Sequence, residues 1–288
     1  QQPSWPDTPR LTGTKHPDST VHRAEQLARA IDSDIAADRD RASRVLGHLE
    51  WHPLVEARQE YEETIRDLLG PCNEVLLDFE GRQISPDWLD VPEKVVLALL
   101  RHGLVPGDDC HLLLRVPNPW LEQDEEKIEK ILAVVARANV LFLLAARRIG
   151  LEPAQNAIYE LTVPQVNARA DLGALMKIGT LYRQAAAHLF SGTPDRVDAF
   201  LQARIPERDR ADLIARVSRV RLVPLVENVG ALSRLPDLLE SFYAMLERNR
   251  GVPGLPSASS FVTRAGEPAA IVRVFVAMSD TAEQSGKI

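Results

Sequence analysis

Two stretches decide the fold that this sequence predicts, RLVPLVE at residues 221–227 and RVFVAMSD at residues 273–280. Each is a short apolar run that ends in a carboxylate, Glu227 in the first stretch and Asp280 in the second. Runs of this length, separated by helical segments, are typical of buried strands in a parallel sheet. A carboxylate at the end of such a strand contributes little to packing, but it is well placed to hold a divalent cation at the mouth of an α/β barrel.

Four more runs have the same strand-like character. Residues 74–79, 111–116 and 157–163 are short and apolar, and a further run at residues 9–13 lies just ahead of His16. Helical periodicity between the runs predicts that helices cover the sheet. The predicted helices lie within residues 19–49 and over residues 53–69, 92–102, 122–148, 168–190, 194–203, 206–217 and 232–249. Residues 122–148 are compatible with one long helix or with two.

The predicted fold class is therefore α/β, in the form of a TIM-type (β/α) barrel with extra helices. Such a barrel has eight strands, whereas this sequence shows six candidates and ends at Ile288, soon after the last of them. We expect a single barrel domain over residues 1–288 that contains about six of the eight strands and lacks the C-terminal part. An open sheet is the alternative.

The composition excludes several functional classes. A net charge of −7 offers no general attraction for nucleic acid or anionic lipid, although a small anionic substrate stays possible. The two cysteines, Cys72 and Cys110, form no CxxC pattern, which argues against a structural zinc site and favours a reducing cytoplasm. The most apolar stretch, residues 131–149, contains three arginines and therefore predicts a buried helix rather than a membrane span.

Polar and charged residues lie at or near the strand ends that a parallel sheet brings to one edge. Enzymes of the α/β class build their sites at this carboxyl edge. The residues concerned are His16, Asp78, Glu80, Arg115, Glu160, Glu227 and Asp280. Each has a simpler explanation, since a charged residue after a strand is often only the first solvated position of a loop. Arg115 could also form a structural salt bridge with Asp78 or Glu80.

Six segments, in the same order along the chain, resemble motifs of archaeal-type phosphoenolpyruvate carboxylase. TKHPD at residues 14–18 resembles the family's QHPDN, DFEGR at 78–82 its DxEGK, and RVPNP at 115–119 its RIPNP. YELTVP at 159–164 is similar to EVILP, VPLVENV at 223–229 to IPLVEDV, and SDTA at 279–282 to SDPA. Each match is short, but their common order makes the resemblance fairly specific.

The resemblance implies a TIM barrel that carboxylates phosphoenolpyruvate with bicarbonate to give oxaloacetate and phosphate. It implies Mg²⁺ or Mn²⁺ as the cofactor, with Glu227 and Asp280 as metal ligands. A hard cation held by two carboxylates can stabilise the enolate that forms when the phosphoryl group leaves. Family members are usually homotetramers, so the resemblance also implies a homo-oligomer.

By position, His16 matches the catalytic histidine of the family, and Arg115 matches an arginine near the substrate. A histidine that titrates near neutrality can take the proton of carboxyphosphate and release CO₂ beside the enolate. An arginine can hold phosphate or carboxylate by two-point contact. Lys15 and Arg82 are, together with Arg115, the candidates for binding the substrate.

Two other functions fit the same residues. Another metal-dependent pyruvate or enolate barrel, such as a lyase or an aldolase, would use the same pair of acids without bicarbonate. A catalytically inactive barrel homologue would keep the fold and lose turnover. This second alternative is favoured by Met278, which stands where the family has an arginine, and by the early end of the chain.

Overall fold

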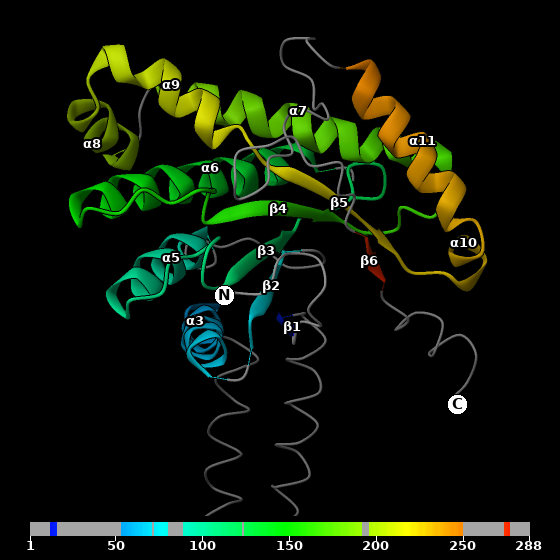
Figure 1. The fold of residues 1–288 in the computed structure, drawn as a ribbon, viewed down its shortest axis with the longest axis horizontal. Helices are drawn as coiled ribbons and strands as arrows, with labels where there is room; N and C mark the ends of the chain where they lie inside the picture. Colours follow the sequence, from blue (N-terminus) through cyan, green and yellow to red (C-terminus); the bar gives the residue numbers. More distant parts are fainter. Residues whose placement is uncertain are drawn as a thin grey trace, which may run out of the picture.

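The computed structural model describes residues 12–15, 53–70, 72–79, 89–122, 124–191, 196–249 and 274–276. Within these residues the strands form one parallel sheet, and their order across the sheet is their order along the chain (Figure 1). The strands are β1 (Thr12–Lys15), β2 (Glu74–Asp78), β3 (His111–Arg115), β4 (Ile158–Val163), β5 (Arg221–Val226) and β6 (Phe275–Val276). The α/β class is therefore confirmed.

The strand predictions hold best in the middle of the chain. The bounds of β2, β3, β4 and β5 agree with the sequence-based prediction to within one residue at each end. β1 begins at Thr12, so it overlaps the strand predicted at residues 9–13 only in part. Of the strand-like run quoted at residues 273–280, only residues 274–276 belong to the described part of the chain, and β6 covers two of them.

Helices connect the strands, as the periodicity predicts. They are α3 (Pro53–Leu69), α5 (Val91–Arg101), α6 (Glu125–Arg148), the 3-10 turn η1 (Arg169–Asp171), α7 (Leu172–His188), α8 (Arg196–Arg204), α9 (Glu207–Val217), α10 (Val229–Leu232) and α11 (Leu235–Arg248). The segment predicted as one helix or two thus contains a single helix, α6, which begins at Glu125, and the helix predicted at residues 232–249 is preceded by the separate short helix α10. The helical prediction within residues 19–49 lies outside the described residues.

Local signals explain the bounds of α6. At its start the side chain of Asp124 accepts a hydrogen bond from Lys127 N (3.0 Å), which caps the first turn. At its end Arg147 and Arg148 lie in the last turn, where positive charge is favourable beside the helix dipole. Gly150 follows with a φ of 78°, a conformation that glycine adopts readily.

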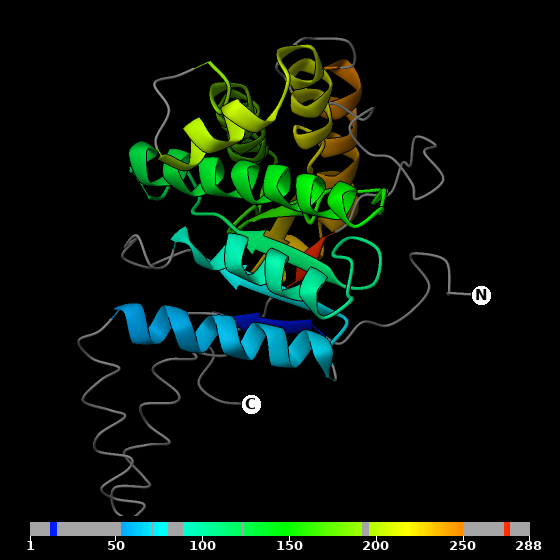
Figure 2. The same ribbon diagram turned by 90° about the vertical axis from the view of Figure 1, so that its left-hand side faces the viewer.

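The two faces of the sheet differ in chemistry. Figures 1 and 2 show the described helices packed on one face of the strands. Val75 and Leu77 of β2, with Leu112 and Leu114 of β3, belong to the apolar core that includes these helices. Because side chains alternate along a strand, the residues between and after them point to the opposite face.

That opposite face carries charged side chains even though it is closely covered. Asp78, Arg115, Glu160 and Arg221 are each less than a tenth exposed. The runs predicted as apolar at β2 to β5 are therefore not apolar on both faces, because this face also carries buried charged side chains. A buried charge is tolerated only when it is paired and hydrogen-bonded, so this face is held by ion pairs as well as by apolar contacts.

In the described part of the chain, no helix combines the length and the apolar character of a membrane span. Cys72 is half-buried, Cys110 is buried, and both are free thiols. Burial raises the pKa of Cys110 to about 12, so its thiol stays protonated at neutral pH and acts as a packing group.

Candidate functional site

Three charged residues meet at the carboxyl edge of the sheet. Asp78 is the last residue of β2, Arg115 is the last residue of β3, and Glu227 directly follows β5. The register of the two neighbouring strands sets Asp78 opposite Arg115. The edge at which α/β enzymes build their sites is therefore occupied by a cluster of charges, as the sequence predicts.

Arg115 and Asp78 form a two-point ion pair. Arg115 Nε donates to Asp78 Oδ1 at 2.8 Å, and Arg115 Nη2 donates to Asp78 Oδ2 at 2.5 Å. Both side chains are buried, with 5% of Arg115 and 1% of Asp78 exposed. The planar guanidinium matches a carboxylate in this arrangement, and the two parallel hydrogen bonds fix its orientation. The simpler interpretation of Arg115, a salt bridge with Asp78, is thus observed.

Arg115 also contacts the candidate metal ligand. Its Nη1 atom lies 3.5 Å from Glu227 Oε1, and Glu227 is only 6% exposed. One guanidinium therefore lies between two carboxylates. Among these three groups the formal charge is −1, which leaves the cluster attractive to a further cation.

The loop after β4 orients Glu227 from the other side. Gln165 N donates to Glu227 Oε2 at 2.9 Å, and Glu227 N donates to Asn167 Oδ1 at 3.1 Å. The loop is shaped in turn by Asp171 Oδ2, which accepts hydrogen bonds from Asn167 N (2.9 Å) and Ala168 N (2.8 Å). The Glu227 carboxylate is thus held in one position before any ligand arrives.

Gln165 makes this contact in an unusual backbone conformation. Its φ is 55°, in the left-handed region that a residue with a Cβ atom rarely adopts. The conformation costs roughly 1–2 kcal/mol, and such strain persists where the surrounding contacts demand it. At Gln165 the contact concerned is the hydrogen bond from its backbone N to the Glu227 carboxylate.

The loop after β3 lies at the same edge. Asn118, which follows β3, donates from Nδ2 to Pro164 O at 2.8 Å and accepts from Trp120 N at 2.9 Å. It is 2% exposed. The loop after β3 is thereby tied to the loop after β4, and the backbone that carries Arg115 is linked to the backbone that carries Gln165.

The structure brings together two of the site residues predicted from the sequence, Arg115 and Glu227. Lys15 is the last residue of β1, and its backbone lies at the same edge, opposite Leu77 in the register. The three other predicted site residues, His16, Arg82 and Asp280, lie outside the described residues.

Glu160 has a different place from the one its position in the sequence suggests. It is fully buried, and its Oε1 atom accepts a hydrogen bond from Arg221 Nη1 at 2.8 Å. Arg221 is the first residue of β5, so this pair lies toward the amino edge of the sheet. Glu160 therefore does not belong to the cluster around Glu227.

Sequence reasoning missed the contributions of Gln165 and Asn167. Both were visible as polar residues beyond β4, but Gln165 acts through its backbone N–H and carries no side-chain signature of this role. Asn167 accepts a hydrogen bond from Glu227 N across 60 residues of chain. An asparagine soon after a strand is compatible with such a role but does not identify its partner.

The donor chemistry of this edge fits a hard divalent cation. Glu227 provides carboxylate oxygens in a fixed position, and Mg²⁺ is commonly bound by only one or two carboxylates together with water and substrate oxygens. Among the described residues there is no group of three potential ligands. The expected second acid, Asp280, lies outside them.

Comparison with known proteins identifies relatives of this chain. The profile of a family described as phosphoenolpyruvate carboxylase matches residues 49–288. A phosphoenolpyruvate carboxylase of Thermofilum pendens is 23% identical over 295 residues, which covers 98% of this chain and 43% of the relative. One of Caldivirga maquilingensis is 26% identical over 237 residues, which covers 79% of this chain and 37% of the relative. The chain thus spans less than half the length of these curated relatives.

Proposed function

The chain belongs to the phosphoenolpyruvate carboxylase family, in its archaeal type, and we propose that it supplies the metal-binding part of such an enzyme. The reaction would be carboxylation of phosphoenolpyruvate by bicarbonate to give oxaloacetate and phosphate. The observation that carries the proposal is the cluster of Asp78, Arg115 and Glu227 at the carboxyl edge of a parallel sheet. These residues stand in the motifs that resemble those of the family.

We propose a TIM-type barrel as the fold of this domain. The support is the strand order, because six parallel strands follow one another across the sheet in the order of the chain. A doubly wound sheet would reverse its order at one point, and no reversal occurs among the described strands. The helices on one face of the sheet also suit the outer layer of a barrel.

Glu227 and Asp280 would hold Mg²⁺ or Mn²⁺. When bound, the cation supplies electrostatic stabilisation for the negative charge that develops on the substrate. Contacts with Gln165 N and Arg115 hold the Glu227 carboxylate at the edge before the cation binds. Such preorganisation lowers the cost of ordering ligands when the cation binds.

The remaining roles fall to basic residues. Arg115, anchored on two of its nitrogens by Asp78, presents its third nitrogen toward Glu227 and would attract the substrate's phosphate or carboxylate. Lys15 and Arg82 would add positive charge for the same anion. A bicarbonate oxygen would attack phosphorus to give carboxyphosphate and the enolate, and His16 would take the carboxyphosphate proton as CO₂ and phosphate separate. The enolate carbon would then attack CO₂ to form oxaloacetate.

The test is a coupled assay on the complete gene product with phosphoenolpyruvate and Mg²⁺. Oxaloacetate is followed through malate dehydrogenase, with and without bicarbonate. We expect bicarbonate-dependent oxaloacetate, and we expect Glu227→Gln to lower kcat/KM by at least about a hundredfold because a metal ligand is lost. Glu207→Gln, which changes an exposed carboxylate on α9, is the matched control and should leave the rate unchanged.

Two outcomes would count against the proposal. Cleavage of a longer acid to pyruvate, without any need for bicarbonate, would favour the lyase or aldolase alternative. No turnover by the complete gene product, together with unchanged Mg²⁺ affinity in Glu227→Gln, would contradict the metal site itself. A homotetramer and a cytoplasmic location, which the family resemblance and the cysteine usage led us to expect, stay predictions.

A further inference from the structure

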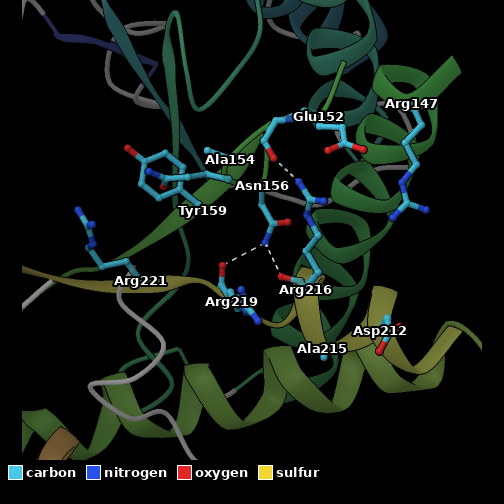
Figure 3. Close-up of a pocket in the computed structure, with 12 residues that line it drawn as sticks. Arg147, Glu152, Ala154, Asn156, Tyr159, Asp212, Ala215, Arg216, Arg219 and Arg221 are labelled. Atoms are coloured by element: carbon cyan, nitrogen blue, oxygen red, sulfur yellow. Dashed lines mark hydrogen bonds between the residues drawn. The ribbon is translucent and has the colours of Figure 1, made fainter. Parts of the chain in front are cut away.

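We propose that this chain binds a small polyvalent anion in a cavity at the amino edge of the sheet, opposite the candidate metal site. The cavity has a volume of about 560 Å³, within the usual range for small-molecule sites. Its charged lining consists of Arg147, Arg216, Arg219, Arg221, Glu152 and Asp212 (Figure 3). None of these residues belongs to the cluster around Glu227, so the inference does not rest on the proposed carboxylase function.

The position of the cavity follows from the connections that form it. One wall comes from the segment between α6, which ends at Arg148, and β4, which begins at Ile158. The other comes from α9 and the turn that leads to Arg221, the first residue of β5. Connections from a helix into a strand lie at the amino edge, which usually serves stability rather than chemistry. A cluster of like charges at this edge therefore needs its own explanation.

The charges of the lining do not balance. The lining holds four arginines and two carboxylates in a chain whose net charge is −7, and with Arg221 paired elsewhere a surplus of one positive charge remains. Arg221 is neutralised by Glu160, but Arg147 and Arg219 form no ion pair with any other described residue. Burial lowers the pKa of Arg216, the positive charges of Arg147 and Arg219 lower it further, and the carboxylate of Glu152 partly offsets them. The guanidinium groups thus repel one another, and a bound anion would remove this repulsion.

The backbone that carries Arg216 and Arg219 is also held in place. Asn156 is 3% exposed, and its Nδ2 atom donates to the carbonyl oxygens of Arg216 (3.2 Å), Val217 (2.9 Å) and Arg219 (3.0 Å). The guanidinium of Arg216 donates to Pro153 O. Figure 3 shows Arg147 and Arg216 on one side of Asn156, Tyr159 and Arg221 on the other, and Arg219 below it. The backbone that carries two of the arginines is therefore fixed before a ligand binds, which favours binding.

The chemistry of the lining defines the class of ligand. Guanidinium groups bind carboxylates and phosphates by paired hydrogen bonds, and several of them together favour a ligand with more than one negative charge. The two carboxylates of the lining, Glu152 and Asp212, disfavour large polyanions and leave room for a compact one. The expected ligands are phosphorylated or polycarboxylate metabolites, for which pyrophosphate and citrate are suitable probes.

Isothermal titration calorimetry of the 288-residue chain with each probe, without divalent cation, tests the proposal. We expect saturable binding of at least one probe. Tighter binding of pyrophosphate would indicate a phosphate-bearing ligand, and tighter binding of citrate would indicate a polycarboxylate. Arg219→Ala and Arg147→Ala, both at exposed positions, should each weaken binding by about tenfold or more through the loss of a charge-assisted contact. Asp212→Asn should strengthen binding, because it removes a repelling charge.

Arg148→Ala is the matched control, since Arg148 neighbours Arg147 at the exposed end of α6 but does not line the cavity. It should leave the affinity unchanged, and thermal unfolding of each variant should show that the fold is retained. The proposal is overturned if neither probe binds. It is equally overturned if Arg147→Ala and Arg219→Ala bind as the unchanged chain does, or if Arg148→Ala weakens binding as much as they do.

Discussion

Arg115 combines a structural role with a place in the candidate site. Its guanidinium is almost completely buried, so an absent partner would leave an uncompensated charge in the interior. Asp78 meets this need with two hydrogen bonds, and Glu227 lies within 3.5 Å on the remaining side. The ion pair and the candidate site are therefore the same arrangement of atoms, and the two sequence-based interpretations of Arg115 do not exclude each other.

We predict that Arg115→Lys lowers both stability and activity although the charge is kept. A lysine cannot form the two parallel hydrogen bonds to Asp78, so the free energy of unfolding should fall by about 1–3 kcal/mol. Activity of the complete gene product should fall as well, because Glu227 loses its oriented neighbour. Urea unfolding and the oxaloacetate assay measure the two effects.

Arg137→Lys provides the control for this change. Arg137 on α6 pairs with Glu93 on α5, away from the carboxyl edge, and both side chains are mostly buried. Its substitution should affect stability but not kcat/KM. Equal loss of activity in both variants would show that Arg115 has no special relation to the site.

At the scale of elements, α6 is joined to the sheet by a polar group in the middle of an apolar helix. Asn139 is fully buried, donates to Ile158 O at 2.9 Å and accepts from Ile158 N at 2.9 Å. It also donates to Tyr182 Oη at 3.0 Å, and Tyr182 in turn donates to Val217 O at 3.0 Å. A single side chain thus acts as a peptide-like partner for the first residue of β4 and connects α6, α7 and the end of α9.

Asn139→Ala should therefore be strongly destabilising. It leaves the N–H and C=O groups of Ile158 without their side-chain partner in a closed interior, so we expect the free energy of unfolding to fall by about 2–4 kcal/mol. Chemical denaturation followed by circular dichroism measures the change. Gln184→Ala, which removes an exposed amide on the neighbouring helix α7, should change stability by less than about 0.5 kcal/mol. Similar losses in the two variants would contradict this account of Asn139.

At the scale of the whole molecule, strands β4 and β5 separate two charged regions. Arg221 opens β5 at the arginine-lined cavity, and Glu227 follows the other end of the same strand at the candidate metal site. A strand of six residues spans roughly 17–20 Å, so ligands at the two edges would not touch each other. The sheet thus separates the two proposed binding regions, one for a cation and one for an anion.

Binding of a divalent cation should stabilise the fold as a whole. At a Mg²⁺ concentration about a hundredfold above its Kd, linkage adds about 2.7 kcal/mol to the free energy of unfolding. Thermal unfolding of the complete gene product with Mg²⁺ and with EDTA measures this effect without reference to activity. Glu227→Gln should abolish the stabilisation and Glu207→Gln should preserve it, whereas stabilisation that survives in Glu227→Gln would place the cation elsewhere.

The strands and helices of the described chain were predictable because their signals are local. The apolar runs and the helical periodicity depend only on neighbouring residues, and they located β2 to β5 to within a residue. The carboxyl edge was predictable for a related reason, since parallel strands bring their ends together whatever their sequence. Arg115 and Glu227 were therefore expected near each other, and they are.

Pairings between residues that lie far apart in the chain could not be predicted from the sequence. The sequence does not show whether Arg115 pairs with Asp78 or with Glu80. It also does not show that Glu160 pairs with Arg221, or that Asn139 forms hydrogen bonds with the backbone of Ile158. These contacts depend on register and on which face of a strand each side chain occupies, and a shift of one residue would reverse them.

The order of apolar runs and the motifs at their ends were thus enough to predict the α/β class, the family and the edge of the sheet at which the candidate site lies. The folded chain alone decided that a backbone N–H at Gln165 orients Glu227, and that arginines from two distant segments surround one cavity. The physical reason is the distance along the chain over which each kind of signal acts. Periodicity and strand-end chemistry are encoded within a few residues, whereas a site is made of atoms that only packing brings within hydrogen-bonding distance.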